Sequence, residues 1–272
     1  MMTNKNRIKR FTPVQRLFHV LLMLSFMVLG ASGLSRLYIN TGWGKWLAGL
    51  FGGYESALLV HTYTGIFLIT GFFVHILYLM AKINPKTIIG PDSLLPRGED
   101  IKQFFSHIGW FLGFRESPRF DRWGYWEKFD YWAVFWGMVI IGITGLIMAY
   151  PLVATRYMPG WGLNVALWVH RIEAFLAMAH VFIIHFFIAH LRRHNFPMDR
   201  AMFEGSTDLE AVRSEKPAWI DRLKKQGDYE NLLVRESQPQ QKAIFFVFGY
   251  IMVAIGLFLI AGALVNWQRV IW

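Results

Sequence analysis

Long apolar runs dominate the chain, and its polar residues gather in the segments between them. Five runs reach the roughly 20 residues that an α-helix needs to cross the hydrocarbon core of a bilayer. They cover residues 13–34, 56–81, 129–150, 163–191 and 243–265. This pattern predicts an all-α integral membrane protein with five transmembrane helices.

The polar segments divide the chain into three predicted parts. Residues 1–197 contain the first four runs and predict a four-helix bundle. Residues 198–241 are polar and charged, and we expect them to dock on a partner or to cover the bundle. Residues 242–272 hold the fifth helix and a short tail. In the loop before the third run, EDIKQFFSHIGWFLGF has the composition of an amphipathic helix on the membrane surface.

Basic residues collect on one side of this topology. Of the 28 Lys and Arg residues, 23 lie in the N-terminal tail and in segments 82–128 and 192–242. Five crossings put these three segments on the same side, and an excess of Lys and Arg marks the cytoplasmic side. The sequence therefore predicts a membrane protein with a cytoplasmic N-terminus and a C-terminus on the outer side. The net charge of +10 then reflects this asymmetry rather than a nucleic-acid partner.

Histidines supply the candidate chemistry. The chain has no cysteine, so it offers no disulfide, no thiolate ligand for an iron–sulfur cluster and no covalent c-type haem attachment. Ionisable residues are costly in a bilayer and mark functional sites there. Six of the nine histidines nevertheless fall in the predicted spans: His19, His61, His75, His170, His180 and His185. That number favours a cofactor site over isolated hydrogen bonds between helices.

The second and fourth helices each present two histidines at two depths. His61 and His170 lie near the predicted outer ends, and His75 and His185 near the predicted inner ends. The spacings of 14 and 15 residues correspond to about 21–22 Å along a helix and to a return within about 40–60° of one face. Two stacked haems, each held by two histidines, need this arrangement. His19 also lies near the inner surface, so the inner site has three candidate ligands.

Other residues near these histidines are candidate contacts. Arg171 follows His170, and its guanidinium can pair with a haem propionate; Arg36 is a second candidate for that role. An arginine at the interface can equally extend toward lipid headgroups. The glycines of the first and third helices predict either tight helix crossings or clearance for a haem; they are Gly30, Gly33, Gly137, Gly142 and Gly145.

Four stretches carry a resemblance to a known family within roughly the first 205 residues. They read RLFHVLLMLSF, LLVHTYTGIF, YWEKFDYWAVFWGMVIIGITGLIM and HRIEAFLAMAHVFIIHFFIAHLRRHNFPMDRAMFEG. In them the chain resembles the membrane di-haem cytochrome b subunits of formate dehydrogenases and nickel–iron hydrogenases. It looks closest to the group that works with periplasmic multihaem cytochromes.

The resemblance implies a bacterial inner-membrane protein with a periplasmic C-terminus and a four-helix bundle that binds two haems b. It implies that His61 and His170 hold the outer haem and that His19 and His185 hold the inner one. It also implies a quinone site near the inner haem, at the start of the third helix. The candidate contacts there are Tyr125, Glu127, Lys128 and Asp130. His75 and the fifth helix depart from the family pattern, so His75 stays an alternative inner ligand and a third haem stays open.

These features predict a cytochrome subunit that moves electrons between menaquinone or ubiquinone and a periplasmic redox subunit. That partner would carry iron–sulfur or multihaem c-type centres within a hetero-oligomeric complex, and we expect overall catalysis in another subunit. One alternative is a self-sufficient transmembrane reductase, although the short outer loops leave little room for a substrate pocket. The other is a non-haem metal or proton transporter that uses the same histidines.

Overall fold

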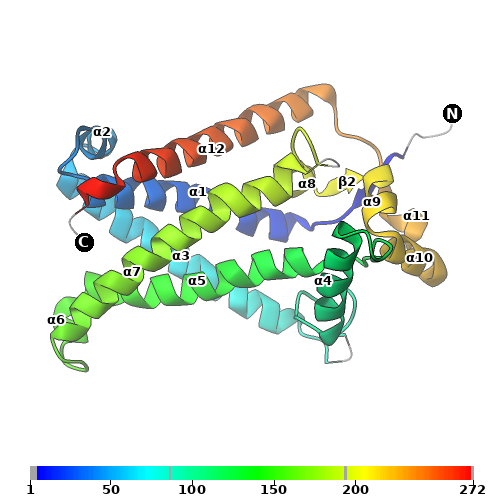
Figure 1. The fold of residues 1–272 in the computed structure, drawn as a ribbon, viewed down its shortest axis with the longest axis horizontal. Coiled ribbons are helices and arrows are strands. Elements are labelled where there is room, and N and C mark those ends of the chain that lie inside the picture. The colour runs from blue at the N-terminus through cyan, green and yellow to red at the C-terminus, as the bar shows by residue number, and fades with distance from the viewer. Residues whose placement is uncertain (1–4, 86, 193–194, 271–272) are drawn as a thin grey trace.

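The computed structural model describes residues 5–85, 87–192 and 195–270. Within these ranges, five helices are long and apolar enough to cross a membrane, and they run along the long axis of the molecule (Figure 1). They are α1 (Pro13–Leu37), α3 (Tyr54–Lys82), α5 (Tyr125–Ala149), the continuous helix Trp161–Leu191 and α12 (Pro239–Val265). The predicted all-α, multi-pass membrane fold is confirmed.

The helix starts follow from local chemistry. Thr12 caps α1, where its hydroxyl accepts a hydrogen bond from the backbone N–H of Gln15, and Pro13 occupies the first turn. At the start of α5, the carboxylate of Glu127 accepts a hydrogen bond of 2.7 Å from the backbone N–H of Gly124. Both caps satisfy backbone groups that a helix end leaves unpaired.

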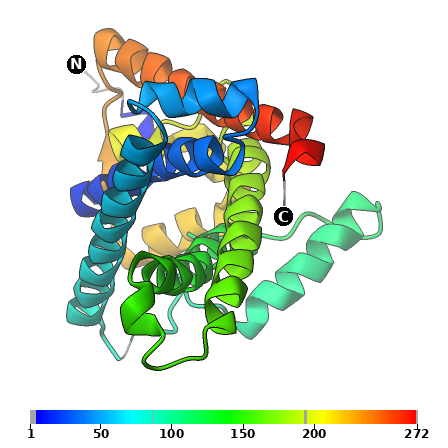
Figure 2. The ribbon, with the colours of Figure 1, turned by 90° about the vertical axis from the view of Figure 1, so that its left-hand side faces the viewer.

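Four of the spans form a ring when viewed from one end. Helix α1 packs on α3, α5 packs on α7 (Trp161–Ala179), and α3 also contacts α5. Figure 2 shows these four helices around a common axis, with α12 outside the ring. The end that carries α2 (Gly42–Leu50) and α6 (Pro151–Ala154) is called the far end below.

The fourth span changes its winding partway along. Helix α7 ends at Ala179 and continues as two π-helical segments, η1 (His180–His185) and η2 (Phe187–Leu191). A π-helix bonds each residue to the fifth along the chain, so its wider turn advances less per residue than an α-helix. The segment therefore changes the direction of the His185 side chain relative to the one that an α-helix would give.

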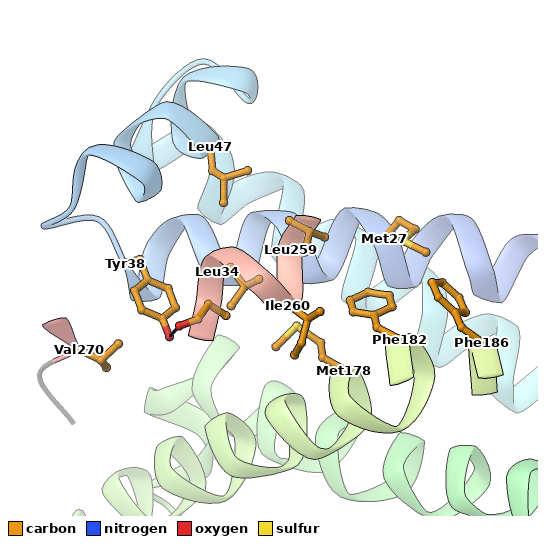
Figure 3. Close-up of a cluster of buried hydrophobic side chains, with 11 residues drawn as sticks. Met27, Leu34, Tyr38, Leu47, Met178, Phe182, Phe186, Leu259, Ile260 and Val270 are labelled. Carbon is orange, nitrogen blue, oxygen red and sulfur yellow. Dashed lines mark hydrogen bonds between the residues drawn. The ribbon is translucent and has the colours of Figure 1, made fainter. Parts of the chain in front are cut away.

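Helix α12 packs against α1 and the fourth span through a buried apolar cluster. Figure 3 shows Leu259 and Ile260 of α12 between Leu34 of α1 and Met178 and Phe182 of the fourth span. The Tyr38 hydroxyl donates a hydrogen bond of 2.9 Å to the Ala263 carbonyl oxygen. Gly256 permits this approach, because a Cβ atom there would come within 2.6 Å of the Phe182 ring.

The end opposite α2 and α6 is called the basic end, because it carries the Lys- and Arg-rich segments. There, β1 (Arg7–Lys9) pairs antiparallel with β2 (Ser206–Asp208) and with β3 (Leu233–Val234). Four short helices complete this part: α8 (Ala201–Glu204), α9 (Leu209–Glu215), α10 (Pro217–Gln226) and α11 (Tyr229–Leu232).

The small sheet was not predicted from the sequence. Ile8 is fully buried in it against a cluster that includes Val212, Trp219 and Leu223. The polar segment 198–241 therefore folds against the N-terminal strand of its own chain. We call residues 206–234 the arm.

Helix α4 (Gly98–Phe111) contacts the start of α5 and projects sideways from the bundle (Figure 2). Its exposed side chains include Ile101, Phe104, Phe105, Ile108 and Phe111. The helix lies across the direction of the spans (Figure 1), as an amphipathic helix at a membrane surface does. Helix α4 thus overlaps the stretch 99–114 that the sequence indicated for a surface helix. The final helical turn, η3 (Trp267–Arg269), follows α12 at the far end.

Candidate functional site

Four of the histidines face one another in two pairs. Toward the far end, the ring centres of His61 on α3 and His170 on α7 are 6.2 Å apart. Toward the basic end, those of His19 on α1 and His185 on η1 are 6.4 Å apart. These pairs are the ones that the family resemblance implied, and each joins helices that are far apart in the sequence.

The separation within each pair fits one iron between two imidazoles. A metal–imidazole bond of about 2.0 Å, with about 1.2 Å more from nitrogen to ring centre, gives about 6.3 Å across an axial pair. The observed 6.2 Å and 6.4 Å match this distance. The geometry therefore fits a haem at both depths.

Hydrogen bonds orient the far-end pair. Nδ1 of His61 lies 3.0 Å from the Ser32 hydroxyl, and Nδ1 of His170 lies 3.1 Å from the Thr144 hydroxyl. Both hydroxyls already donate to carbonyl oxygens of their own helices, those of Val28 and Ile140. They must therefore accept from the imidazole N–H groups, which leaves the lone pair of each histidine on Nε2, the nitrogen that can bind iron.

A glycine follows each of these hydroxyl residues and makes room for the ring. A Cβ atom at Gly33 would lie 3.2 Å from Cε1 of His61, and one at Gly145 would lie 3.3 Å from Cε1 of His170. Clearance for the imidazoles themselves thus accounts for these two glycines. Ser32 and Thr144 were not predicted as partners of the histidines. The Ser-Gly and Thr-Gly dipeptides in ASGL and ITGL are the feature of the sequence that could have indicated them.

The basic-end pair is oriented by a carboxylate. Oδ2 of Asp130 accepts a hydrogen bond of 2.6 Å from Nδ1 of His185, and Oδ1 lies 2.8 Å from Nε2 of His180. His180 therefore supports the pair through Asp130. Asp130, predicted as a quinone or proton contact, instead lies directly behind a candidate ligand.

Unpaired buried groups lie beside both pairs. Nδ1 of His19 and Nε of Arg36 are buried without a hydrogen-bond partner among the described residues. The Arg36 guanidinium also lies 3.3 Å from the Tyr54 hydroxyl and acts electrostatically on His61 and His170. A free buried N–H beside the far-end pair suits an anionic group such as a propionate. Arg171, the first candidate for that role, is half-buried.

His75 lies outside these pairs. Its Nε2 is 3.2 Å from the Tyr131 hydroxyl, and its ring packs edge-on against Phe18 with the centres 4.9 Å apart. The structure thus brings His19 to His185 and His75 to Tyr131.

The remaining quinone candidates are engaged in local contacts. Glu127 forms ion pairs with Arg10 and, at 2.6 Å, with Lys216 of the arm. Lys128 is buried and lies 2.8 Å and 2.9 Å from the two carboxylate oxygens of Asp100.

Tyr125 lies 3.0 Å from Nδ1 of His107, the histidine of α4. Burial lowers the pKa of His107, and the nearby Arg192 lowers it further.

The Glu127 ion pairs join the arm to the bundle. Lys216 is only 1% exposed, and its burial lowers the pKa of its ammonium group to about 8 despite the attraction of Glu127. A charge removed from water in this way is tolerated only when an opposite charge compensates it. The contact therefore depends on both partners.

The comparison with protein families agrees with this geometry. A search of curated protein sequences finds no match. The family model of prokaryotic cytochrome b561 matches residues 10–205, a range that contains both histidine pairs and ends before the arm and α12. The chain belongs to the prokaryotic cytochrome b561 family, and it is therefore a membrane b-type cytochrome that binds haem b and takes part in electron transfer.

Proposed function

We propose that this chain is the quinone-reactive cytochrome subunit of a larger redox complex. In this proposal, His61 and His170 hold one haem b, and His19 and His185 hold a second. Electrons pass between a quinone at the basic end and a redox partner at the far end. The observation that carries the proposal is the presence of two histidine pairs, with ring centres 6.2 Å and 6.4 Å apart, at two depths of one bundle.

Each part of the chain has a defined task in this scheme. Haem iron, when bound, supplies reversible one-electron transfer, with a potential set by its ligands and their burial. Ser32 and Thr144 fix the tautomer of the far-end pair, which leaves Nε2 of both histidines for the metal. The bond from Nδ1 of His185 to Asp130 does the same at the basic end. The apolar walls of the spans keep both sites away from water.

The proposed orientation places the basic end in the cytoplasm of a bacterium and the far end in the periplasm. The distribution of Lys and Arg supports it. The far end then meets the redox partner, an iron–sulfur or multihaem c-type subunit. The C-terminal residues 271–272 of the predicted outer tail lie outside the described residues.

We propose His75 and Tyr131 as the quinone contacts. Glu127 and Lys128 are held in ion pairs, which a quinone would have to displace. His75 and Tyr131 instead form a neutral hydrogen-bonding pair between α3 and α5, and both side chains are partly exposed. Tyr131 also follows Asp130, so this pair lies close to the basic-end site.

The histidine geometry favours this function over a non-haem metal or proton transporter. A tetrahedral metal site needs three or four protein ligands, whereas each pair here converges with two. A self-sufficient transmembrane reductase would use the same two haems without a partner subunit. Reduction of a soluble outer acceptor by the purified chain alone would favour that alternative.

Haem counting on single-histidine variants tests the proposal. The pyridine haemochrome of the purified protein should give two haems b per chain. We expect His61→Leu and His170→Leu each to remove one haem, and His19→Leu and His185→Leu each to remove the other. The haem that remains in each variant reports that the bundle has folded. His75→Leu is the matched control and should keep both.

Two results would contradict the proposal. A protein without haem would remove its basis. If His75→Leu lost the basic-end haem and His19→Leu kept it, His75 rather than His19 would be the second ligand of that haem. His75 would then not belong to the quinone site.

A further inference from the structure

The hydrogen-bond partners behind the two histidine pairs differ in charge. At the far end, both imidazole N–H groups donate to neutral hydroxyl oxygens, those of Ser32 and Thr144. At the basic end, His185 donates to the carboxylate of Asp130 over 2.6 Å. This bond is shorter than either of the hydroxyl contacts, as expected for an ionised acceptor.

This difference acts on the metal through the ligand. A carboxylate that accepts the second N–H of a ligand histidine increases the basicity of the imidazole. A more basic ligand stabilises ferric over ferrous iron and so lowers the reduction potential. A hydroxyl oxygen that is itself donating to a backbone carbonyl polarises the N–H far less.

The nearby charges act in the same direction. Asp130 adds a negative charge beside the basic-end pair, whereas Arg36 acts electrostatically on both histidines of the far-end pair. A positive charge favours the reduced iron because reduction lowers the charge of the site. At the opposite end, carboxylates compensate several of the basic side chains, since Arg10 and Lys216 are paired with Glu127, and Lys128 with Asp100. Arg16 donates instead to the backbone carbonyl oxygen of Phe203.

We infer that Asp130 is a positioning residue that makes the basic-end haem the lower-potential one, which favours electron transfer from the basic-end haem to the far-end haem. The inference rests on the proposed function. A quinol at the basic end would give up two electrons and two protons and become a quinone. The two electrons would leave singly at the far end, each reducing one equivalent of a one-electron acceptor there.

His180 moderates the effect of Asp130. It shares the carboxylate through a 2.8 Å contact with Oδ1, which reduces the negative charge available to His185. Removal of this second contact should strengthen the bond to His185. The two residues therefore have opposite effects on the same haem.

Redox titration of the purified holoprotein, followed in the α-band, tests the inference. The wild type should titrate in two separate steps. In Asp130→Asn, the midpoint potential of the low-potential step should rise by at least about 59 mV. At a fixed potential, the ferrous-to-ferric ratio of that haem would then increase at least tenfold. In His180→Leu, the midpoint potential of the same step should fall. The midpoint potential of the other step should stay unchanged in both variants.

Two controls make the assignment specific. His61→Leu should lose the far-end haem and keep the low-potential step. Glu99→Gln removes a carboxylate from α4, where the side chain of Glu99 is exposed, and should shift neither step.

Three outcomes would overturn the inference while leaving the two-haem function intact. In the first, the low-potential step survives in His19→Leu but not in His61→Leu. In the second, Asp130→Asn leaves both midpoint potentials unchanged. In the third, His180→Leu shifts the low-potential step in the same direction as Asp130→Asn. Absence of haem from the wild type would instead contradict the proposed function itself.

Discussion

Ser32 on α1 and His61 on α3 are joined by a hydrogen bond of 3.0 Å between the serine hydroxyl and Nδ1 of the imidazole. The hydroxyl hydrogen is already directed at the Val28 carbonyl oxygen, 2.7 Å away. One serine thereby fixes the tautomer, the ring orientation and the free nitrogen of a candidate haem ligand. Thr144 and His170 repeat this arrangement between α5 and α7.

Removal of these hydroxyls should weaken haem binding at the far end alone. Loss of a partner behind a metal ligand typically costs about 10–100-fold in metal affinity. We expect Ser32→Ala and Thr144→Val each to release one of the two haems faster to an excess of apomyoglobin. Ser35→Ala is the matched control, because Ser35 is equally buried on α1 and donates to the Ser32 carbonyl rather than to a histidine. Equal release from all three variants would show a general loosening of α1.

A methyl group at Gly33 should displace the His61 ring. Its Cβ atom would lie 3.2 Å from Cε1 of His61, so the ring must move by a few tenths of an ångström. We expect Gly33→Ala to shift the potential and the low-spin EPR signal of the far-end haem and to leave the other haem unchanged. Gly71→Ala on α3 is the control, because a Cβ atom there meets nothing within 4 Å. A normal far-end signal in Gly33→Ala would contradict the close contact.

The five spans could be predicted from the sequence because each one must satisfy the same physical demand. A bilayer requires about 20 apolar residues per crossing, and this requirement is visible without any partner in space. The resemblance to a family gave the pairs His61–His170 and His19–His185. Depth alone left His19 and His75 equivalent, because both lie near the same surface. Their side-chain directions depend on how α1, α3 and α5 pack.

Other features depend on contacts between distant residues, which a local pattern does not encode. β1 is three residues long, and its partners follow some 200 residues later, so no periodicity indicates the sheet. The carboxylate of Asp130 looks like an interfacial group until the fold brings it to His185. The π-helical turn that carries His185 has no residue signature in the stretch HVFIIH.

His75 and Tyr131 are expected to affect the quinone and not the haems. His75→Phe and Tyr131→Phe each remove one partner of their 3.2 Å hydrogen bond and keep an aromatic ring of similar size. We expect both haems to remain and the KM for a short-chain quinol analogue to rise about tenfold, as for loss of one hydrogen bond of about 1.4 kcal/mol to the substrate. Tyr78→Phe, on the same helix as His75, is the control. An unchanged KM in both variants would exclude the pair as the quinone contact.

Attachment of the arm should become stronger as the pH rises above about 8. Burial lowers the pKa of Lys216 to about 8 in the docked arm, whereas an exposed lysine titrates near pH 10.4. Between these values the released arm binds a proton that the docked arm does not, so a rise in pH favours docking by up to about tenfold per pH unit. Below about pH 8 both states carry the proton, and the dependence on Lys216 disappears.

Hydrogen exchange of residues 206–234 between pH 7 and 10, corrected for intrinsic exchange rates, measures this attachment. Protection of the arm should rise across the upper part of this range in the wild type. In Lys216→Met, the protection of the arm should not rise with pH, because methionine carries no proton to release. Lys225→Met removes an exposed lysine from the same arm and should keep the wild-type slope. A slope that survives in Lys216→Met would assign the titration to another group, and the Glu127 contact would then be a constant part of the structure rather than a pH-dependent one.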